Sequence, residues 1–430
     1  MHVYFSGIGG SGANSIALLA KQAGYEVSGS DAQPSTTIDY LKKRGITDIH
    51  IGQTTEAITE VHRNKPIGQF VYTSALPMTD PNHPELMFCK QNNIPALKHD
   101  EFLASFISSK NLMLVAIAGT HGKSTTTAMT VWLATQLGIK ASWVVGAKMA
   151  FADSGHFNPE GRLFIYEADE FDKKFLSFRP HTALIAGVDW DHPDIYPSRE
   201  KYYQAFKDFL GQSEKALAWK SDLNKLGLRP SDNLVILDDK NPQISKNMKL
   251  AGLVNRQDAW LVAQAANKYM EIPLDKAINI LNGFPGLSRR FEEIVPNLYT
   301  DYAHTPPKIR GALQMAHEAA GQDIVVVYEG LHNTRQHFIK DELANLFDDV
   351  KQLYIVPSYL AREDENLKLL SPTDLLNMLS IKSKDHAEAA KFDDNLKQLI
   401  QKHISSGDLV LCLSAGGASS LDEWLRKEFA

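Results

Sequence analysis

Short apolar runs alternate with helix-like segments along nearly the whole chain. The runs are HVYFSG, LMLVAIAG, RLFIYEA, TALIAGV, DIVVVYE, QLYIVPS and DLVLCLS. Most of them end at a glycine, a serine or an acid before the next helix-like segment begins. Parallel strands have this continuous apolar character because helices cover both faces of their sheet. The pattern therefore predicts an α/β protein.

The spacing of these runs divides the chain into three α/β sets. With 430 residues, the chain is too long to fold around a single core. One break falls near residue 108, before LMLVAIAG, and another near residue 295, before LYTDYAHTPP. We expect three domains of ordinary size, covering residues 1–107, 108–295 and 296–430.

Composition and charge exclude several classes of function. The chain is 43% hydrophobic, 22% charged and has a net charge of −6, so no global positive charge attracts nucleic acid. No apolar stretch approaches the roughly 18 residues of a membrane span, and the start MHVYFSGIGGSG lacks the pattern of a secretory signal. Cys89 and Cys412 are too few for a disulfide framework and are expected to be buried. We expect a cytoplasmic protein with no nucleic-acid or membrane partner.

The first predicted strand leads into a glycine-rich turn. The sequence GIGGSG fits the spacing G-x-G-x-x-G, and the next strand-like run ends at Asp31. Such a turn lets the backbone approach a diphosphate, while the acid binds a ribose or a base. We expect Gly7, Gly9, Gly10 and Gly12 to form a nucleotide-binding loop with Asp31. A turn that only packs the first helix is the structural alternative, and a nicotinamide dinucleotide is one possible ligand.

A second nucleotide motif follows the run that ends at Ala118. The sequence GTHGKS is a phosphate loop shortened by two residues, and a helix-like segment follows it. In such loops, backbone N–H groups and a lysine bind phosphate, and a serine hydroxyl binds Mg²⁺. The motif predicts ATP with Mg²⁺. The residues expected at ATP are Gly119, Thr120, His121, Gly122, Lys123, Ser124 and Thr125.

Acidic residues end two further strand-like runs and could bind metal. Glu167, Asp169 and Glu170 follow one run, and Asp189, Asp191 and His192 follow another. Carboxylate oxygens suit Mg²⁺, and the histidine suggests a second cation site beside the first. We expect Glu170, Asp189 and Asp194 to remain solvated charges.

Taken together, these segments resemble the Mur ligases, the ATP-dependent amide-forming enzymes of peptidoglycan synthesis, over essentially the whole chain. AGTHGKSTTT is similar to the family's phosphate loop, EADEFDKKFLSFRP and DWDHPDIY to its metal-binding strand ends, GLSRRFE to its arginine-bearing linker and TDYAHTPPKI to its C-terminal motif. GIGGSGANSIALLAKQAGYEVSGSD and VYTSALPMTDPNHPE resemble the branch that acts on UDP-N-acetylmuramate itself.

The resemblance implies a three-domain fold. A Rossmann-like N-terminal domain would bind the UDP substrate, a central P-loop ATPase domain would bind ATP, and a Rossmann-like C-terminal domain would bind the amino acid. The glycine loop would then hold the diphosphate of the UDP substrate, with Asp31 and Ser74 also at this ligand.

The resemblance also implies roles for individual residues. Lys123, Arg290 and His304 form the implied catalytic set, and Ser124, Glu167 and His192 the implied metal ligands. Asn255 would meet the adenine, Arg290 the γ-phosphate, Asp301 the ATP ribose, and His304 the region where the substrates meet. Arg335 and His332 would bind the amino acid. The structural alternatives are a helix cap for Asn255, a surface ion pair for Arg290, a rigid turn for His304 and an exposed loop position for His332.

Three departures from the family pattern concern the incoming amine. The segment YEGLHNTRQHF replaces the Gln-Pro-His segment of alanine-adding enzymes and partly resembles the recycling ligase. Val254 stands where the family often has histidine, and LSAGGASSLDEW differs from the usual Gly-Ala-Gly-Asp ending. L-alanine is the favoured partner of UDP-N-acetylmuramate, while glycine, L-serine and a peptide remain open. The choice between a monomer and a homodimer also remains open.

Other classes of protein explain less of the chain. A murein tripeptide recycling ligase is the alternative within the family. A nicotinamide-dependent dehydrogenase with an added NTPase domain explains the first glycine loop but not the RRF and DYAH segments. A non-catalytic nucleotide sensor is the third alternative.

Overall fold

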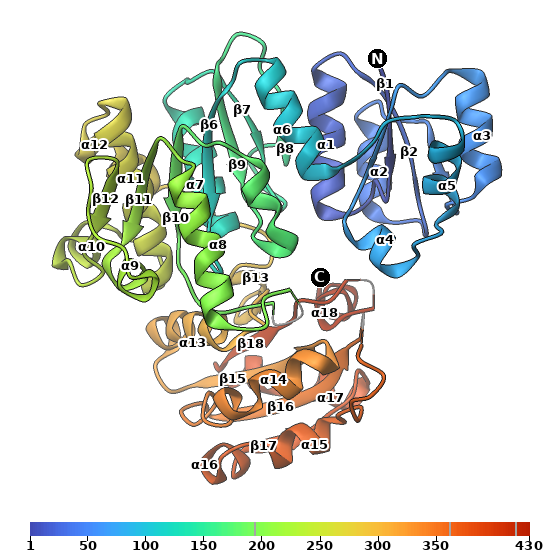
Figure 1. Cartoon of the computed structure of the whole chain (residues 1–430). Helices are drawn as coiled ribbons and strands as arrows, with labels where there is room; N and C mark the ends of the chain where they lie inside the picture. Colours follow the sequence, from blue (N-terminus) through green and yellow to red (C-terminus); the bar gives the residue numbers. More distant parts are fainter. Residues whose placement is uncertain (193–194, 361–362, 418) are drawn as a thin grey trace. The chain divides into compact units, whose positions relative to one another are not determined.

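The strands of the described residues form three sheets, each flanked by helices (Figure 1). The computed structural model describes residues 1–192, 195–360, 363–417 and 419–430. The chain forms two units, one comprising Met1–Met248 and Gln257–Pro285 and the other Lys249–Arg256 and Gly286–Ala430. The first unit contains two of the sheets and the second contains one. The predicted α/β class is confirmed, while the predicted domain boundaries stay predictions.

The first sheet has the order β3-β2-β1-β4-β5 and is parallel throughout. Its strands are β1 (His2–Ser6), β2 (Glu26–Asp31), β3 (Ile49–Ile51), β4 (Gln69–Tyr72) and β5 (Ala96–Lys98). Its helices are α1 (Ser11–Gln22), α2 (Thr36–Lys43), α3 (Thr55–Asn64), α4 (Ala75–Thr79), α5 (Pro84–Gln91) and α6 (His99–Ser109).

Helices cover both faces of the first sheet (Figure 1). On β1, Val3 and Phe5 belong to the core formed with α1 and α6, whereas Tyr4 belongs to the core formed with α3 and α5. All five residues of β1 are buried as a result. The strand order reverses at β1, and ligands of open α/β sheets bind at the carboxyl ends of the strands at such a point.

The second sheet has the order β12-β11-β10-β6-β9-β7-β8 and is parallel except for the pairing of β7 with β8. Its strands are β6 (Met113–Ala118), β7 (Ala141–Val144), β8 (Gly155–His156), β9 (Leu163–Glu167), β10 (Thr182–Ile185), β11 (Lys215–Trp219) and β12 (Leu234–Leu237). The helices that accompany it are α7 (Lys123–Gln136), the 3₁₀ helix η1 (Phe171–Ser177), α8 (Arg199–Gly211), α9 (Lys220–Leu226), α10 (Pro242–Asn247), α11 (Leu253–Met270) and α12 (Leu274–Leu281).

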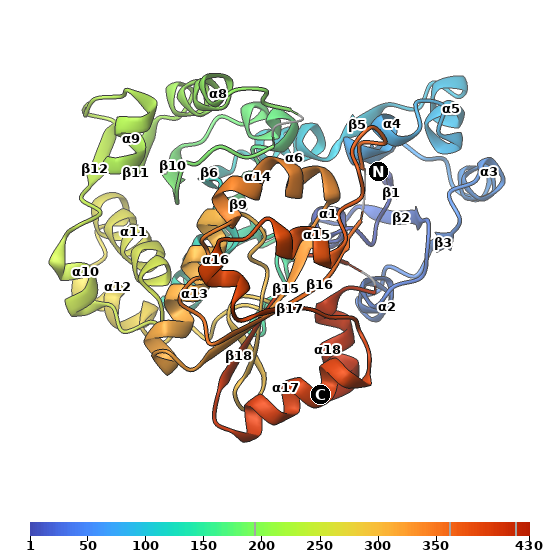
Figure 2. The ribbon, with the colours of Figure 1, turned by 90° about the horizontal axis from the view of Figure 1, so that it is seen from below.

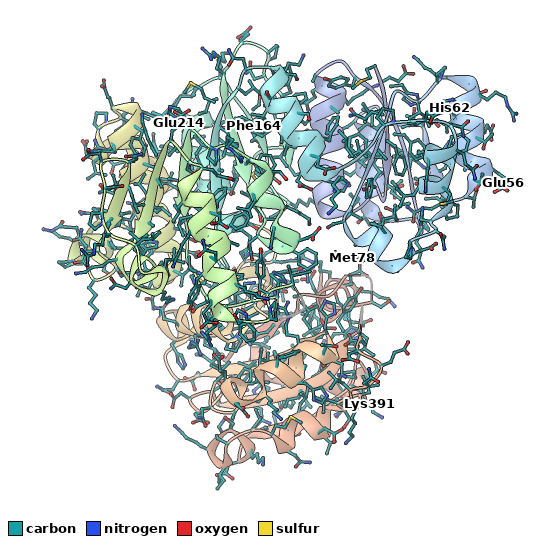
Figure 3. The ribbon with its side chains drawn as sticks, in the orientation of Figure 1. Glu56, His62, Met78, Phe164, Glu214 and Lys391 are labelled. Carbon is teal, nitrogen blue, oxygen red and sulfur yellow. The ribbon has the colours of Figure 1, made fainter. Side chains whose placement is uncertain are left out.

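The order of this sheet places three strand ends side by side. β6 lies between β9 and β10, so the phosphate loop and both acidic segments emerge at the same edge. Phe164 on β9 is fully buried in the interior, whereas Glu214 lies at the surface (Figure 3). Helix α11 begins in the second unit and continues in the first.

The third sheet has the order β13-β14-β18-β15-β16-β17, with β13 antiparallel to β14 and the other pairs parallel. Its strands are β13 (Glu292–Val295), β14 (Leu298–Asp301), β15 (Ile324–Leu331), β16 (Gln352–Tyr359), β17 (Ala387–Ala389) and β18 (Leu409–Leu413). Its helices are α13 (Pro306–Ala320), α14 (Asn333–Leu343), α15 (Pro372–Asn377), α16 (Ile381–Lys384), α17 (Asp394–Ser405) and α18 (Leu421–Phe429).

Successive residues of β15 pack into two different hydrophobic cores, one on each face of the sheet, as those of β1 do. Val326 packs with residues of α13 and α15, and Val327 packs with residues of α17 and α18. Figure 2 shows α17 and α18 on one face of this sheet and α13 to α16 on the other. Both cysteines are buried, and burial raises the pKa of the Cys89 thiol to about 12. No helix among the described residues has the length and apolar composition to cross a bilayer.

Candidate active site

The phosphate loop connects β6 to α7 near the centre of the second sheet. Two of its glycines have backbone angles of the left-handed region, with φ of +151° at Gly119 and +75° at Gly122. A Cβ atom at Gly119 would lie 2.9 Å from the Gly187 carbonyl oxygen, so a side chain is excluded there. Gly122 precedes the first turn of α7, whose N–H groups have no partner within the helix. This geometry is typical of an anion-binding loop.

Thr120 fastens the loop to the end of β10. Its N–H donates to the Gly187 carbonyl oxygen at 2.7 Å, and its hydroxyl donates to the Asp189 carbonyl oxygen at 2.5 Å. The hydroxyl oxygen of Thr120 also lies 2.7 Å from the Tyr202 hydroxyl, and the Thr120 side chain is buried. Both the N–H and the hydroxyl of Thr120 are therefore engaged in holding the loop against the end of β10.

Lys123 forms a buried ion pair with Glu170 beside the loop. Its Nζ lies 2.7 Å from Oε2 of Glu170 and donates to the Gly119 carbonyl oxygen at 2.6 Å. Burial alone would raise the pKa of Glu170, but the charges of Lys123 and His192 lower it to about 2. Glu170 is 1% exposed, so the expectation of a solvated charge was wrong. A lysine enclosed by a loop needs a nearby counter-charge, which sequence spacing does not reveal.

Ser124 and Glu167 lie side by side because β9 is the neighbour of β6. The Ser124 hydroxyl donates to Oε1 of Glu167 at 2.8 Å, and the Gly146 N–H donates to Oε2 at 2.7 Å. Hydroxyl and carboxylate oxygens in this arrangement are hard ligands of the kind that Mg²⁺ prefers.

His192 lies on the other side of Glu170. Its Nε2 is 3.6 Å from Oε1 of Glu170, and its ring meets Phe171 edge-on with centroids 5.0 Å apart. Oε1 of Glu170 is buried without a hydrogen-bond partner in the described part of the chain, so a cation held by His192 would also satisfy this oxygen.

The donor set fits Mg²⁺ as two separate pairs, Ser124 with Glu167 and His192 with Glu170. No three His, Cys, Asp or Glu side chains among the described residues form a metal-binding cluster. Mg²⁺ commonly takes only one or two carboxylates from the protein, and substrate phosphates and water complete its octahedral shell.

Asp189 and Asp194 are the other two residues that were expected to be solvated charges. Asp189 is half-buried, with Nζ of Lys225 at 3.2 Å and Nε2 of His121 at 3.8 Å from its carboxylate oxygens. His121 is thereby held beside the end of β10. Asp194 lies outside the described residues.

The glycine turn after β1 is tied to the end of β2. The Gly9 N–H donates to Oδ2 of Asp31 at 2.8 Å, and a Cβ atom at Gly9 would lie equally close to that oxygen. Gly7 has φ of +71°, and the Gly10 N–H closes the turn by donating to the Gly7 carbonyl oxygen at 3.0 Å. Gly12 is exposed in the first turn of α1. The structure brings the glycines and Asp31 together at the point where the strand order reverses.

Two buried groups lie near the adjacent strand ends of this sheet. Ser74 follows β4 and is 2% exposed, and its hydroxyl has no hydrogen-bond partner among the described residues. Glu85 is fully buried and accepts from the hydroxyls of Tyr4 at 2.7 Å and Ser6 at 2.5 Å. Sequence reasoning missed Glu85, because its partners come from β1, about eighty residues away in the chain.

In the second unit, Arg290 and Asp301 lie together at the end of β14. Asp301 accepts from the N–H groups of Phe291 and Ala303, both at 2.8 Å. Burial raises the pKa of Asp301, and the charge of Arg290 opposes that rise. The Arg290 guanidinium lies 4.7 Å from the centroid of the Tyr302 ring.

His304 and Asn255 are both engaged within the second unit. His304 is 6% exposed, with Nδ1 2.8 Å from the Tyr302 carbonyl oxygen and Nε2 3.4 Å from Nζ of Lys308. Asn255 lies in the first turn of α11, where its amide donates to the Ala251 carbonyl oxygen at 2.9 Å. These contacts fix the orientation of both side chains.

His332 and Arg335 lie at the start of α14. His332 has φ of +59° and directly precedes the helix, and its Nδ1 is 3.6 Å from Oε1 of Glu363. Glu363 also accepts from the N–H of Thr334 at 2.9 Å. Arg335 is half-buried in the first turn of the helix. The structure therefore places both residues expected at the amino acid beside the carboxyl end of β15.

Models of one protein family match the N-terminal, central and C-terminal parts of the chain. The family models described as "Mur ligase family, catalytic domain", "Mur ligase middle domain" and "Mur ligase, glutamate ligase domain" match residues 2–111, 117–225 and 289–416. UDP-N-acetylmuramate–L-alanine ligases of Clostridium perfringens and Clostridium acetobutylicum are 27% and 28% identical to the chain. The first match covers 99% of this chain and 97% of the relative, and the second covers 98% and 96%.

Two solved structures share the fold. A UDP-N-acetylmuramate–alanine ligase of Thermotoga maritima matches with a TM-score of 0.77 and 22% identity, over 100% of this chain and 98% of that one. A murein peptide ligase of Psychrobacter arcticus matches with a TM-score of 0.67 and 21% identity, over 97% and 96%.

The fold and the matches place the chain among the ATP-dependent, amide-forming ligases. It belongs to the Mur ligase family. The predicted three-domain fold, with Rossmann-like N- and C-terminal domains and a central P-loop domain, is confirmed. The dehydrogenase alternative is not favoured by these matches.

Proposed function

We propose that the protein joins L-alanine to UDP-N-acetylmuramate with ATP, through an acyl phosphate, in peptidoglycan precursor synthesis. The observation that carries this proposal is the phosphate loop, in which Lys123 pairs with Glu170 and Ser124 with Glu167 across the adjacent ends of β6 and β9. The activity named in the curated relatives, which match nearly the whole chain, supports the choice of substrates.

The reaction begins when a carboxylate oxygen of the muramate bonds to the γ-phosphorus of ATP and the bond to ADP breaks. The neutral amine of the amino acid then attacks the acyl carbon and loses a proton, and the tetrahedral intermediate collapses to the amide and phosphate. Both early reactants are anions, so fixed positive charge is needed to offset their repulsion.

Lys123 is the charge that this proposal assigns to the ATP phosphates. In the structure its ammonium group is held by Glu170 and the Gly119 carbonyl oxygen, directly beside the loop N–H groups. Arriving phosphates bring a competing negative charge to the same ammonium group. We assign Gly119, His121, Gly122 and Thr125 to the remaining contacts of the loop with the phosphates, and Thr120 to the support of the loop at the same ATP site. Arg290 is assigned to the γ-phosphate, Asp301 to the ribose and Asn255 to the adenine.

Ser124 and Glu167 are the proposed ligands of one Mg²⁺ ion, and His192 is the proposed ligand of a second cation beside it. When bound, the cation would neutralise phosphate charge and polarise the transferring phosphoryl group. Oε1 of Glu170, which lies beside His192 and has no hydrogen-bond partner within the described ranges, supports a cation at this place. His304, oriented by Tyr302, is assigned to the region where the substrates meet.

The UDP substrate is assigned to the first sheet. The backbone N–H groups of the glycine turn would face its diphosphate. The proposed polar contacts are Asp31, which accepts from the Gly9 N–H, and the hydroxyl of Ser74, which has no partner among the residues described.

The amine is assigned to Arg335 and His332. A guanidinium can bind the α-carboxylate of L-alanine through two parallel hydrogen bonds. The murein tripeptide recycling ligase is the second candidate, because the segment from Tyr328 to Phe338 departs from the alanine-adding pattern.

The test is phosphate release by the full-length protein from ATP with Mg²⁺ and UDP-N-acetylmuramate, against a panel of L-alanine, glycine, L-serine and a murein tripeptide. We expect release that requires all three substrates and is fastest with L-alanine. Release with the tripeptide alone would assign the protein to the recycling reaction. Release independent of any amine, or fluorescence changes with NADH, would refute the ligase proposal.

A further inference from the structure

Asp258 is a buried acid behind the phosphate loop that the proposed mechanism does not use. It lies on the part of α11 that belongs to the first unit and is 1% exposed. A Cβ atom placed on Gly122 would lie 2.8 Å from its Oδ1 and 3.2 Å from its Oδ2. The carboxyl group therefore fills the space directly behind the residue that precedes Lys123.

The surroundings of Asp258 favour the uncharged acid. In the described part of the chain, neither Oδ2 of Asp258 nor the hydroxyl of Thr126, also fully buried, makes a hydrogen bond of ordinary geometry, although the hydroxyl lies close enough to the carboxyl group to lower its pKa. Burial raises the pKa of Asp258 well above its usual range, and Thr126 offsets only part of the rise. A carboxylate buried without a nearby cation is strongly disfavoured, so such a group takes up a proton instead.

We propose that Asp258 is a positioning residue for ATP: its uncharged carboxyl group supports Gly122 and Thr126 from behind and so fixes the shape of the phosphate loop. This inference rests on the proposed function, since it concerns the same ATP site. An ionised carboxylate in this position would repel the phosphates, whereas a neutral group of the same shape only holds the backbone. The proposed role requires a side chain of this shape that carries no charge.

The two requirements can be separated by two substitutions. Asp258→Asn keeps the shape and is always uncharged, and Asp258→Leu keeps the approximate volume but cannot hydrogen-bond. The readout is the equilibrium dissociation constant of Mg·ATP for the full-length protein, with that of UDP-N-acetylmuramate as the control for folding. Asp408→Asn, a buried aspartate of the second unit paired with Lys351 at 2.5 Å, controls for general destabilisation.

We expect Asp258→Asn to bind ATP within about twofold of the wild type and Asp258→Leu to bind at least tenfold more weakly, with UDP-substrate binding unchanged in both. Wild-type ATP affinity in Asp258→Leu would overturn the proposal, and so would an equal loss in both variants, because that would mean the negative charge is needed.

Two further outcomes keep the tests distinct. If Asp258→Leu fails to fold, Thr126→Val tests the same contact, and unchanged ATP affinity in that variant would count against the proposal. If the wild type binds no ATP, the proposed function itself is wrong and this inference falls with it.

Discussion

Three buried acids show how a residue's surroundings decide its charge. Glu170 is ionised because Lys123 lies 2.7 Å away. Asp258 has no cation beside it among the residues that the structure describes, and burial favours its neutral form. Glu329 has two hydrogen-bond donors but no ion pair among the described residues, and burial raises its pKa to about 7. Residue type alone therefore does not indicate which carboxyl group carries charge.

At the residue scale, Glu167 provides a test of the metal assignment. Glu167→Ala removes the carboxylate that accepts from Ser124 and Gly146. We expect the Mg²⁺ concentration for half-maximal activity to rise at least tenfold and kcat to fall by orders of magnitude. A Mg²⁺ titration of activity measures both, and wild-type Mg²⁺ dependence would contradict the assignment.

Arg335 provides the corresponding test of the amine assignment. Arg335→Ala should raise the KM for L-alanine by about 10- to 100-fold, since a charge-assisted bidentate contact is lost. ATP and UDP-substrate affinities should stay nearly constant. Steady-state kinetics with each substrate varied in turn measure this, and Lys340→Ala, further along α14, is the matched control.

At the scale of elements, the ends of β15 and β18 are joined by Glu329. The Ser414 hydroxyl donates to Oε2 at 2.6 Å, and the N–H of Leu421, at the start of α18, donates to Oε1 at 3.0 Å. Both partners lie more than eighty residues further along the chain. The acid thus links two strands and a helix through a single buried carboxyl group.

This link predicts a pH dependence of stability in the second unit. The folded pKa of about 7 lies above the ordinary value of 4.5, so the folded state retains a proton that the unfolded state releases between these values. Stability should therefore fall by about 3 kcal/mol as pH rises from 4.5 past 7. Glu329→Gln should remove most of this dependence.

Pulse proteolysis in urea at several pH values measures this effect, with second-unit fragments identified by mass. Glu388→Gln, on the exposed edge strand β17, serves as the control substitution. If the stability of the wild-type second unit rose between pH 5 and 7, and Glu329→Gln removed that rise, the assigned protonation state would be contradicted.

The sequence predicted the elements better than the contacts between them. The apolar runs marked strands such as β1, β6 and β15, because both faces of a parallel strand are buried. The phosphate loop was evident because its glycines and Lys123 are contiguous. Glu85, Glu170 and Asp258 were missed or misjudged, since their partners come from other strands and helices. Local spacing contains no information on which of several nearby acids points inward.

At the scale of the whole molecule, the glycine turn and the phosphate loop lie on different sheets of the first unit. Lys123→Ala should therefore abolish turnover and weaken ATP binding at least tenfold, while UDP-N-acetylmuramate binds as in the wild type. Calorimetric titration of each ligand measures the separation. A folded variant that loses UDP-substrate binding would contradict the assignment of the two ligands to separate sheets.

The discontinuous second unit has a consequence for recombination within the family. Residues 249–256 precede the rest of that unit by about thirty residues of chain, and Arg256 forms a two-pronged pair with Glu318, whose carboxylate also accepts from the Gly252 N–H. A chimaera that exchanged only the chain after Pro285 would combine this short segment with a foreign Glu318 region. Crossovers that preserve the protein must therefore carry both stretches from one parent, so a cassette for this unit has to begin before residue 249 and not after Pro285.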